Sequence, residues 1–130
     1  MKSKSNARIL VVGGAMETAL YDLMLKPACH ETRVLAFAEE VYLPLRTHEE
    51  KILKTILDFR PHLIVMSCEG GIDEFLVRLK EAFKEGDRPS VVVIAAKDDW
   101  CFNADICLSG PVDPNDLLQT VENLLQKRAE

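Results

Sequence analysis

Short apolar runs alternate along the chain with segments whose apolar residues recur every three or four positions. The runs are rich in β-branched residues and nearly continuous, which is typical of parallel strands that are covered on both faces. They predict five strands, at residues 8–12, 33–37, 63–66, 91–95 and 106–108.

The periodic segments predict four helices, each with one apolar face turned toward a core. We expect the first helix to stop at Lys26, because Pro27 pushes the residue before it out of the α region. The predicted core-facing stripes, in chain order, are Met16, Ala19, Leu20, Leu23 and Met24; Ile52, Leu53, Ile56 and Leu57; Ile72, Phe75, Leu76, Leu79 and Phe83; and Leu117, Leu118, Val121, Leu124 and Leu125.

Capping and helix-breaking residues predict where the other helices begin or end. Thr47 and Glu50 have the spacing of a capping box, so Thr47 is the expected N-cap of the second helix. Gly86 is expected to end the third helix. Asp113 and Pro114 match the N-cap and first position of the last helix.

The alternation of strands and helices predicts an α/β fold, a three-layer sandwich around a five-stranded parallel sheet with right-handed crossovers. Residues 96–105 are few for a parallel crossover, which usually needs about a dozen residues with its helix. We therefore expect the fourth helix of the sandwich to be missing or shortened. The predicted domain spans residues 7–127, with a flexible tail at 1–6 and a tail or the start of a linker at 128–130.

Several segments resemble the receiver domain of two-component response regulators. They are GIDEF at residues 71–75, VVVIAAKDD at 91–99 and NADICLSGPVDPNDLL at 103–118. The likeness extends from Ala7 to about Lys127. It implies a CheY-like, flavodoxin-like fold with strand order 2-1-3-4-5, whose reactive crevice lies at the carboxyl ends of the strands.

The resemblance also implies a phosphorylation site, and this chain departs from the family pattern at each position of that site. Ser67 stands where receivers carry the aspartate that accepts the phosphoryl group. The remaining departures are Gly13 and Gly14 for the acidic pair that holds Mg²⁺, Ala95 for a hydroxyl residue, and Gly110, before Pro111, for a lysine. Because cation ligands, nucleophile and charge clamp are all replaced, we expect a degenerate pseudo-receiver without phosphorylation chemistry.

A receiver typically binds partners through its fourth helix, fifth strand and last helix, and here that face is remodelled between Trp100 and Leu108. Trp100 and Phe102 either form an apolar patch for a partner or fold back over the core. Cys107 takes the place of an aromatic switch residue in the fifth strand. The expected function is phosphorylation-independent signalling through a protein partner, without enzymatic activity.

Composition narrows the partners and the compartment. A net charge of -5 argues against a general nucleic-acid surface, and no window approaches the ~20 apolar residues of a membrane span. The four cysteines lack CxxC spacing, so we expect no metal site and no structural disulfide. We therefore expect a cytoplasmic protein without a cofactor, and without direct contact to nucleic acid or membrane.

Three alternatives remain open from the sequence. The chain could be a flavodoxin-like binder of a small molecule or nucleotide that uses Gly13 and Gly14, at a strand–helix junction, and the crevice at Ser67, although the complete glycine motif is lacking. Cys68 and Cys101 both follow strand ends and could form a redox pair. Ser67 could be phosphorylated, but the sequence places no histidine or carboxylate clearly within reach to activate its hydroxyl. The oligomeric state is likewise open.

Overall fold

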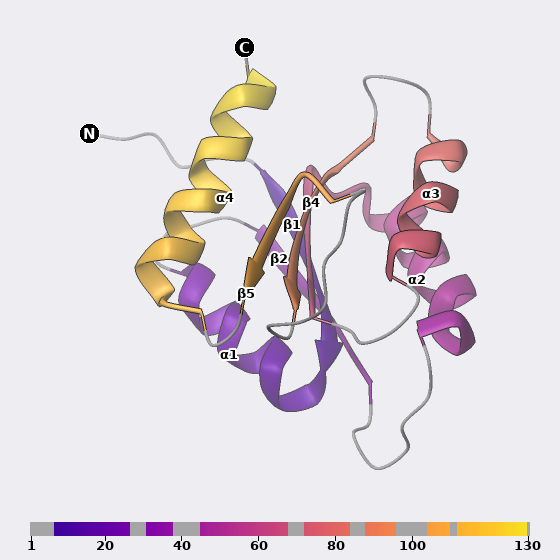
Figure 1. Ribbon diagram of the computed structural model, residues 1–130, viewed down its shortest axis with the longest axis horizontal. Coiled ribbons are helices and arrows are strands. Elements are labelled where there is room, and N and C mark those ends of the chain that lie inside the picture. Colours follow the sequence, from indigo (N-terminus) through magenta and orange to yellow (C-terminus); the bar gives the residue numbers. More distant parts are fainter. Residues whose placement is uncertain are drawn as a thin grey trace.

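The computed structural model describes residues 7–26, 31–37, 45–67, 72–83, 88–95, 104–109 and 112–129. Strands and helices follow one another in the order β1-α1-β2-α2-β3-α3-β4-β5-α4 (Figure 1). The strands are β1 (Arg8–Gly14), β2 (Glu31–Phe37), β3 (Leu63–Ser67), β4 (Ser90–Ala95) and β5 (Ile106–Ser109). The helices are α1 (Ala15–Leu25), α2 (Leu45–Phe59), α3 (Ile72–Ala82) and α4 (Pro114–Ala129).

The five strands form one parallel sheet in the order β2-β1-β3-β4-β5, which confirms the predicted topology. In Figure 1, α1 and α4 cover one face of this sheet and α2 and α3 cover the other. All strands run in the same direction, so their carboxyl ends reach one common edge. At that edge Gly13 of β1 is paired with Ser67 of β3.

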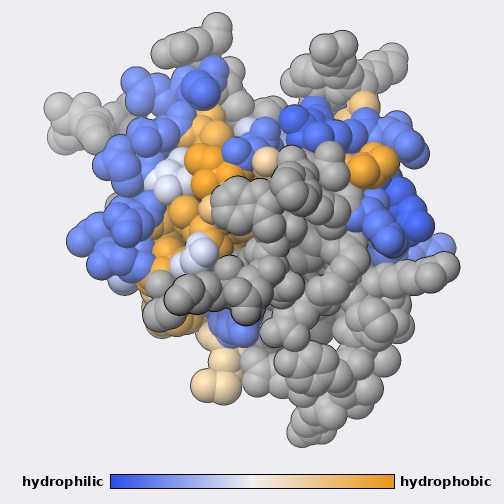
Figure 2. All heavy atoms as spheres, in the orientation of Figure 1, coloured by the Kyte–Doolittle hydropathy of each residue, from blue (hydrophilic) through white to orange (hydrophobic). Residues whose placement is uncertain are grey.

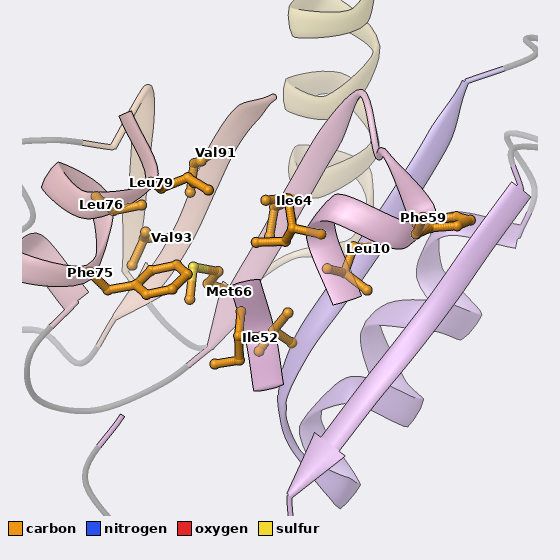
Figure 3. Packing of buried hydrophobic residues seen from close by; sticks show 12 residues of the cluster. Leu10, Ile52, Phe59, Ile64, Met66, Phe75, Leu76, Leu79, Val91 and Val93 are labelled. Carbon is orange, nitrogen blue, oxygen red and sulfur yellow. The ribbon is translucent and has the colours of Figure 1, made fainter. Parts of the chain in front are cut away.

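Two apolar cores fill the space between the sheet and its helices, because successive side chains of a strand point to opposite faces. The core on the α2–α3 side contains Leu10, Val12, Ile52, Ile56, Phe59, Ile64, Met66, Phe75, Leu76, Leu79, Val91 and Val93 (Figure 3). The core on the α1–α4 side contains Ile9, Val11, Tyr21, Leu25, Leu63, Val65, Val92, Ile94, Leu117 and Val121.

Helix α1 turns a different face to the sheet than its sequence pattern predicts. Its buried residues are Thr18, Tyr21 and Leu25. Four of the five residues of the predicted core stripe are instead exposed: Ala19, Met16 (75%), Leu20 (51%) and Leu23 (61%). The prediction was wrong because α1 has apolar residues on both sides, so apolarity alone does not select the face that packs on the sheet.

The predictions for the helix ends are partly confirmed. Asp113 caps α4, since its side-chain oxygen Oδ1 accepts a hydrogen bond of 2.8 Å from the N–H of Asn115. Helix α1 ends at Leu25, as expected. The predicted N-cap at Thr47 was wrong, because α2 already begins at Leu45. A capping-box spacing also fits inside a helix, and it does not exclude helical residues before it.

Helix α3 ends at Ala82, before the predicted stop at residue 86, which lies outside the described residues. The described residues between β4 and β5 contain no helix, but residues 96–103 of this link are not among them.

The start of β5 is tied to the start of β4. The side chain of Asp105 accepts a hydrogen bond of 2.7 Å from the N–H of Val91. The N–H of Asp105 donates in turn to the carbonyl of Val91 at 3.0 Å. Arg88 adds an ion pair with Asp105 at 3.6 Å.

No helix within the described ranges is long and apolar enough to cross a membrane.

Candidate functional site

The carboxyl edge of the sheet brings together four of the residues that the sequence singles out. Gly13 and Gly14 end β1, Ser67 ends β3 and Ala95 ends β4. In open parallel α/β sheets this edge is where ligands and reactive groups are found. The described members of the predicted site therefore share this edge of the sheet.

The backbone at Gly13 leaves no room for a side chain. A Cβ atom at this position would lie 2.6 Å from the carbonyl oxygen of Ser67, closer than such atoms approach in proteins. The φ angle of 158° is also one that L-residues rarely adopt. Glycine is thus required here, and an acidic side chain at this position would displace the end of β3.

The hydroxyl of Ser67 donates a hydrogen bond to the carboxylate oxygen Oε2 of Glu17. Glu17 lies in the first turn of α1, where a negative side chain interacts favourably with the helix dipole. Tyr21, one turn further along α1, also forms a hydrogen bond with the Ser67 side chain. Ser67 is therefore held by two side chains from a neighbouring element, and the inference that no carboxylate is placed beside it is corrected.

The pKa of Tyr21 is raised above its ordinary value of 10.0. Burial is the largest cause, because it disfavours the charged phenolate. The hydrogen bond with Ser67 acts in the opposite direction, and the negative charge of Glu17 raises the pKa further. The phenol of Tyr21 consequently stays protonated at neutral pH, and the carboxylate of Glu17 supplies the negative charge of the cluster.

Glu17 and Tyr21 were missed because neither belongs to the apolar stripe expected to pack. They are four residues apart, so they lie on the same side of α1. That spacing, directly after a strand that ends in two glycines, was the available signal. This spacing predicts a contact with Ser67 only if the side of α1 that carries Glu17 and Tyr21 faces β3. The sequence does not determine which side of α1 faces β3.

A serine hydroxyl bonded to a carboxylate has the arrangement of a nucleophile with a base. Here, however, the charge of Glu17 opposes the approach of an anionic phosphoryl group or nucleotide phosphate to Ser67 and to the Gly13–Gly14 junction. Among the described residues, no three side chains of the metal-ligating types gather in one place. The described part of the site therefore suits a polar contact within the chain better than phosphoryl transfer.

Cys107 is a half-buried free thiol that packs against the core on the α2–α3 side. It thus contributes to packing on that side of the sheet. Figure 2 shows apolar residues gathered between β5 and α4, and α4 lies on the other side of the sheet. The other predicted site residues lie outside the described residues, and the expectations for them stay predictions: Cys68, Trp100, Cys101, Phe102, Gly110 and Pro111.

A parallel sheet of order β2-β1-β3-β4-β5 with helices on both faces defines the CheY-like class of flavodoxin-like α/β proteins. Solved structures that resemble this chain are receiver domains of that class. The CheY-like receiver domain protein from Methanospirillum hungatei has a TM-score of 0.73 and 18% identity, covering 96% of this chain and 98% of that chain.

Two further receiver domains show the same likeness. One, from a Francisella response regulator, has a TM-score of 0.70 and 15% identity, covering 94% of this chain and 98% of that chain. The other, a signal receiver domain from Vibrio parahaemolyticus, has a TM-score of 0.71 and 16% identity, covering 96% and 94%. At these identities the likeness establishes the receiver fold. No protein-family model and no curated protein matches the sequence.

Proposed function

We propose that this chain is a pseudo-receiver, a signalling module that recognises a protein partner without an aspartyl-phosphate cycle. The observation that carries the proposal is the hydrogen bond from Ser67, at the position of the phosphoryl acceptor, to the carboxylate of Glu17. The receiver fold supports the signalling class. Receiver domains among the similar structures come from a modulated diguanylate cyclase and an HD domain-containing protein, which favours a protein partner.

The chemistry of phosphoryl transfer supports the loss of the cycle. Mg²⁺ is bound through oxygen ligands, and carboxylates are its usual protein ligands. Gly13 and Gly14 provide no carboxylates, and the space at Gly13 is closed by the Ser67 carbonyl. A transferred phosphoryl group also needs positive charge around its oxygens, whereas the charged group bonded to Ser67 is the carboxylate of Glu17.

The absence of the cycle is tested with phosphoramidate or acetyl phosphate and Mg²⁺, followed by intact-mass measurement. We expect no phosphorylated protein from this chain or from its Ser67→Asp variant, because an acceptor alone does not restore the cation ligands. A receiver domain with the complete acidic set serves as the positive control. A stable phosphoprotein from the unaltered chain would contradict the proposal.

Recognition of a protein partner is tested separately, in cells of the organism that encodes the chain. A tagged chain should capture the same partner as its Ser67→Ala and Glu17→Gln variants, since recognition does not depend on modification of the site. Loss of that partner from both variants, with folding intact by circular dichroism, argues against phosphorylation-independent recognition.

A further inference from the structure

Strand β2 lies at one end of the described sheet. Strand β2 pairs with β1 without interruption from Glu31 to Phe37, and no described strand lies on its other side. It contains no proline or lysine and no bulge, which are common devices that keep edge strands from pairing with another chain. Strand β5, at the other edge, is only four residues long.

The backbone groups that point outward from β2 follow from its pairing with β1. The N–H of Glu31 donates to the carbonyl of Ala7 at 3.2 Å, so this residue faces β1. In a parallel ladder, alternate residues direct their backbone groups to alternate sides. Thr32, Val34 and Ala36 therefore present their N–H and C=O groups at the outer edge.

The α1 side of this edge is apolar. Thr32 donates a hydrogen bond of 2.7 Å to Asp22 of α1, so Val34, two residues on, faces the same side of the sheet. The side chain of Val34 is 39% exposed. On α1, the exposed Ala19 lies one turn from Asp22, and the exposed Leu23 lies one turn from Ala19. An exposed apolar surface thus adjoins the open strand.

The opposite side of β2 carries two complementary charges. Glu31 and Arg33 are both exposed, and their spacing puts them on one face of the strand. The guanidinium of Arg33 lies 4.4 Å from the centre of the Phe59 ring, which places this face on the α2 side.

We propose that a second copy of this chain pairs with β2 in antiparallel orientation, about a two-fold axis at Thr32. A register centred on Arg33 would set two arginines opposite each other. In a register centred on Val34, neither Glu31 nor Arg33 would face a residue of opposite charge. The register centred on Thr32 sets Glu31 of each copy opposite Arg33 of the other. These are non-hydrogen-bonded pairs, in which side chains approach most closely and unlike charges stabilise the pairing.

This arrangement also covers the exposed face of α1. Helix α1 contacts both β1 and β2, so with a strand spacing of about 4.8 Å the two copies of α1 would lie about 10 Å apart. That is the usual separation of packed helices, and Leu23 and Val34 would be buried between the copies. The interface is closed by its two-fold symmetry, and it is independent of the proposed signalling function.

The test is sedimentation-velocity centrifugation of the full chain over a range of concentrations. We expect a concentration-dependent dimer. Glu31→Arg and Arg33→Glu, each alone, should weaken dimerisation roughly tenfold or more, because each sets like charges opposite one another. The double reversal should restore it. A monomer at every concentration, or a dimer unaffected by both single reversals, overturns the proposal.

Matched apolar substitutions locate the surface. Val34→Lys and Leu23→Asp should abolish the dimer. Val77→Lys and Leu57→Asp, which change residues exposed by 43% and 49% on α3 and α2, should leave it intact. Circular dichroism of each variant checks folding. Dimer loss at Val77 or Leu57 but not at Val34 would place the contact elsewhere and overturn the proposal.

Hydrogen exchange of the unaltered chain tests the pairing without any substitution. The outward amide of Thr32 should become protected as the concentration rises, since it would donate to the carbonyl of Thr32 in the second copy. Unchanged exchange of this amide in a sample that is dimeric by sedimentation overturns pairing through β2.

Discussion

At the residue scale, Ser67 shows how the surroundings of a side chain change its chemical role. The sequence placed Ser67 at the end of a buried strand, and the structure confirms that position. Its partners were not predictable, because Glu17 and Tyr21 reach it only through the orientation of α1. The resemblance suggested that the Ser67 hydroxyl marks a degenerate phosphoacceptor position. In the structure this hydroxyl belongs to a hydrogen-bonded cluster.

The raised pKa of Tyr21 predicts a loss of stability at high pH. The folded protein holds the phenol proton more tightly than the unfolded chain. This stabilisation is therefore complete below the unfolded value of 10.0 and is lost as the pH rises through the folded pKa. Urea unfolding across this alkaline range should show a steeper fall for the unaltered chain than for Tyr21→Phe.

An absorbance titration of the tyrosines provides the matched measurement. The transition that disappears in Tyr21→Phe should lie above pH 10.0. Ser67→Ala should move it higher still, since the hydrogen bond with Ser67 lowers the pKa. A transition at or below the value of an exposed tyrosine would contradict the burial of this phenol.

The two neighbouring glycines should respond differently to the same substitution. Gly13→Ser should cost about 1–3 kcal/mol of unfolding free energy, because its Cβ would strike the Ser67 carbonyl. Gly14→Ser should be neutral or stabilise by a few tenths of a kcal/mol, since Gly14 is the N-cap of α1 with φ -65° and ψ 157°, a conformation that serine favours. Urea unfolding measures both, and equal effects would contradict the close contact at Gly13.

At the element scale, sequence periodicity identified each of the four described helices but not every buried face. Ile52 and Ile56 of α2, and Phe75 and Leu79 of α3, are buried as predicted. Helices α2 and α3 carry charged residues on the side opposite these apolar ones, so the sequence pattern identifies only one face that can pack on the sheet. Helix α1 has few charged residues, and its buried face contains Thr18, whose hydroxyl donates to the Gly14 carbonyl at 2.9 Å.

Two leucines of α1 provide a direct test of its orientation. Leu25→Ala should cost about 2–5 kcal/mol, because it leaves a cavity in the core beneath α1. Leu23→Ala should change the unfolding free energy by less than about 0.5 kcal/mol, since the side chain is exposed in the single chain. Both are measured by urea unfolding at a concentration where the protein is monomeric. A larger loss of unfolding free energy for Leu23→Ala than for Leu25→Ala would instead support the buried face that the sequence pattern predicted.

At the scale of the whole molecule, the order of the strands separates a rigid centre from two edges. Strands β1 and β3 lie between other strands and have buried side chains on both faces. Strand β5 is short, lies at an edge and has half-buried side chains. The long edge strand β2 is the one that carries self-complementary charges.

Native-state hydrogen exchange should follow this order. The amides of Val11 and Val65 should exchange most slowly, because opening them requires unfolding of both cores. The amides of β5 should exchange faster, by local opening at the edge. Mass spectrometry of peptides from dilute, monomeric protein gives the comparison, and equal protection of β5 and β3 would contradict it.

The sequence by itself determined the class of fold and the positions at the carboxyl edge of the sheet. Continuous apolar runs require burial on both faces, and their alternation with helices leaves few parallel topologies. Tertiary structure decided which side of α1 meets the sheet, and therefore that Glu17 and Tyr21 hold Ser67. The reason is physical: local patterning fixes which segments are apolar, whereas contacts between distant segments depend on how those segments pack.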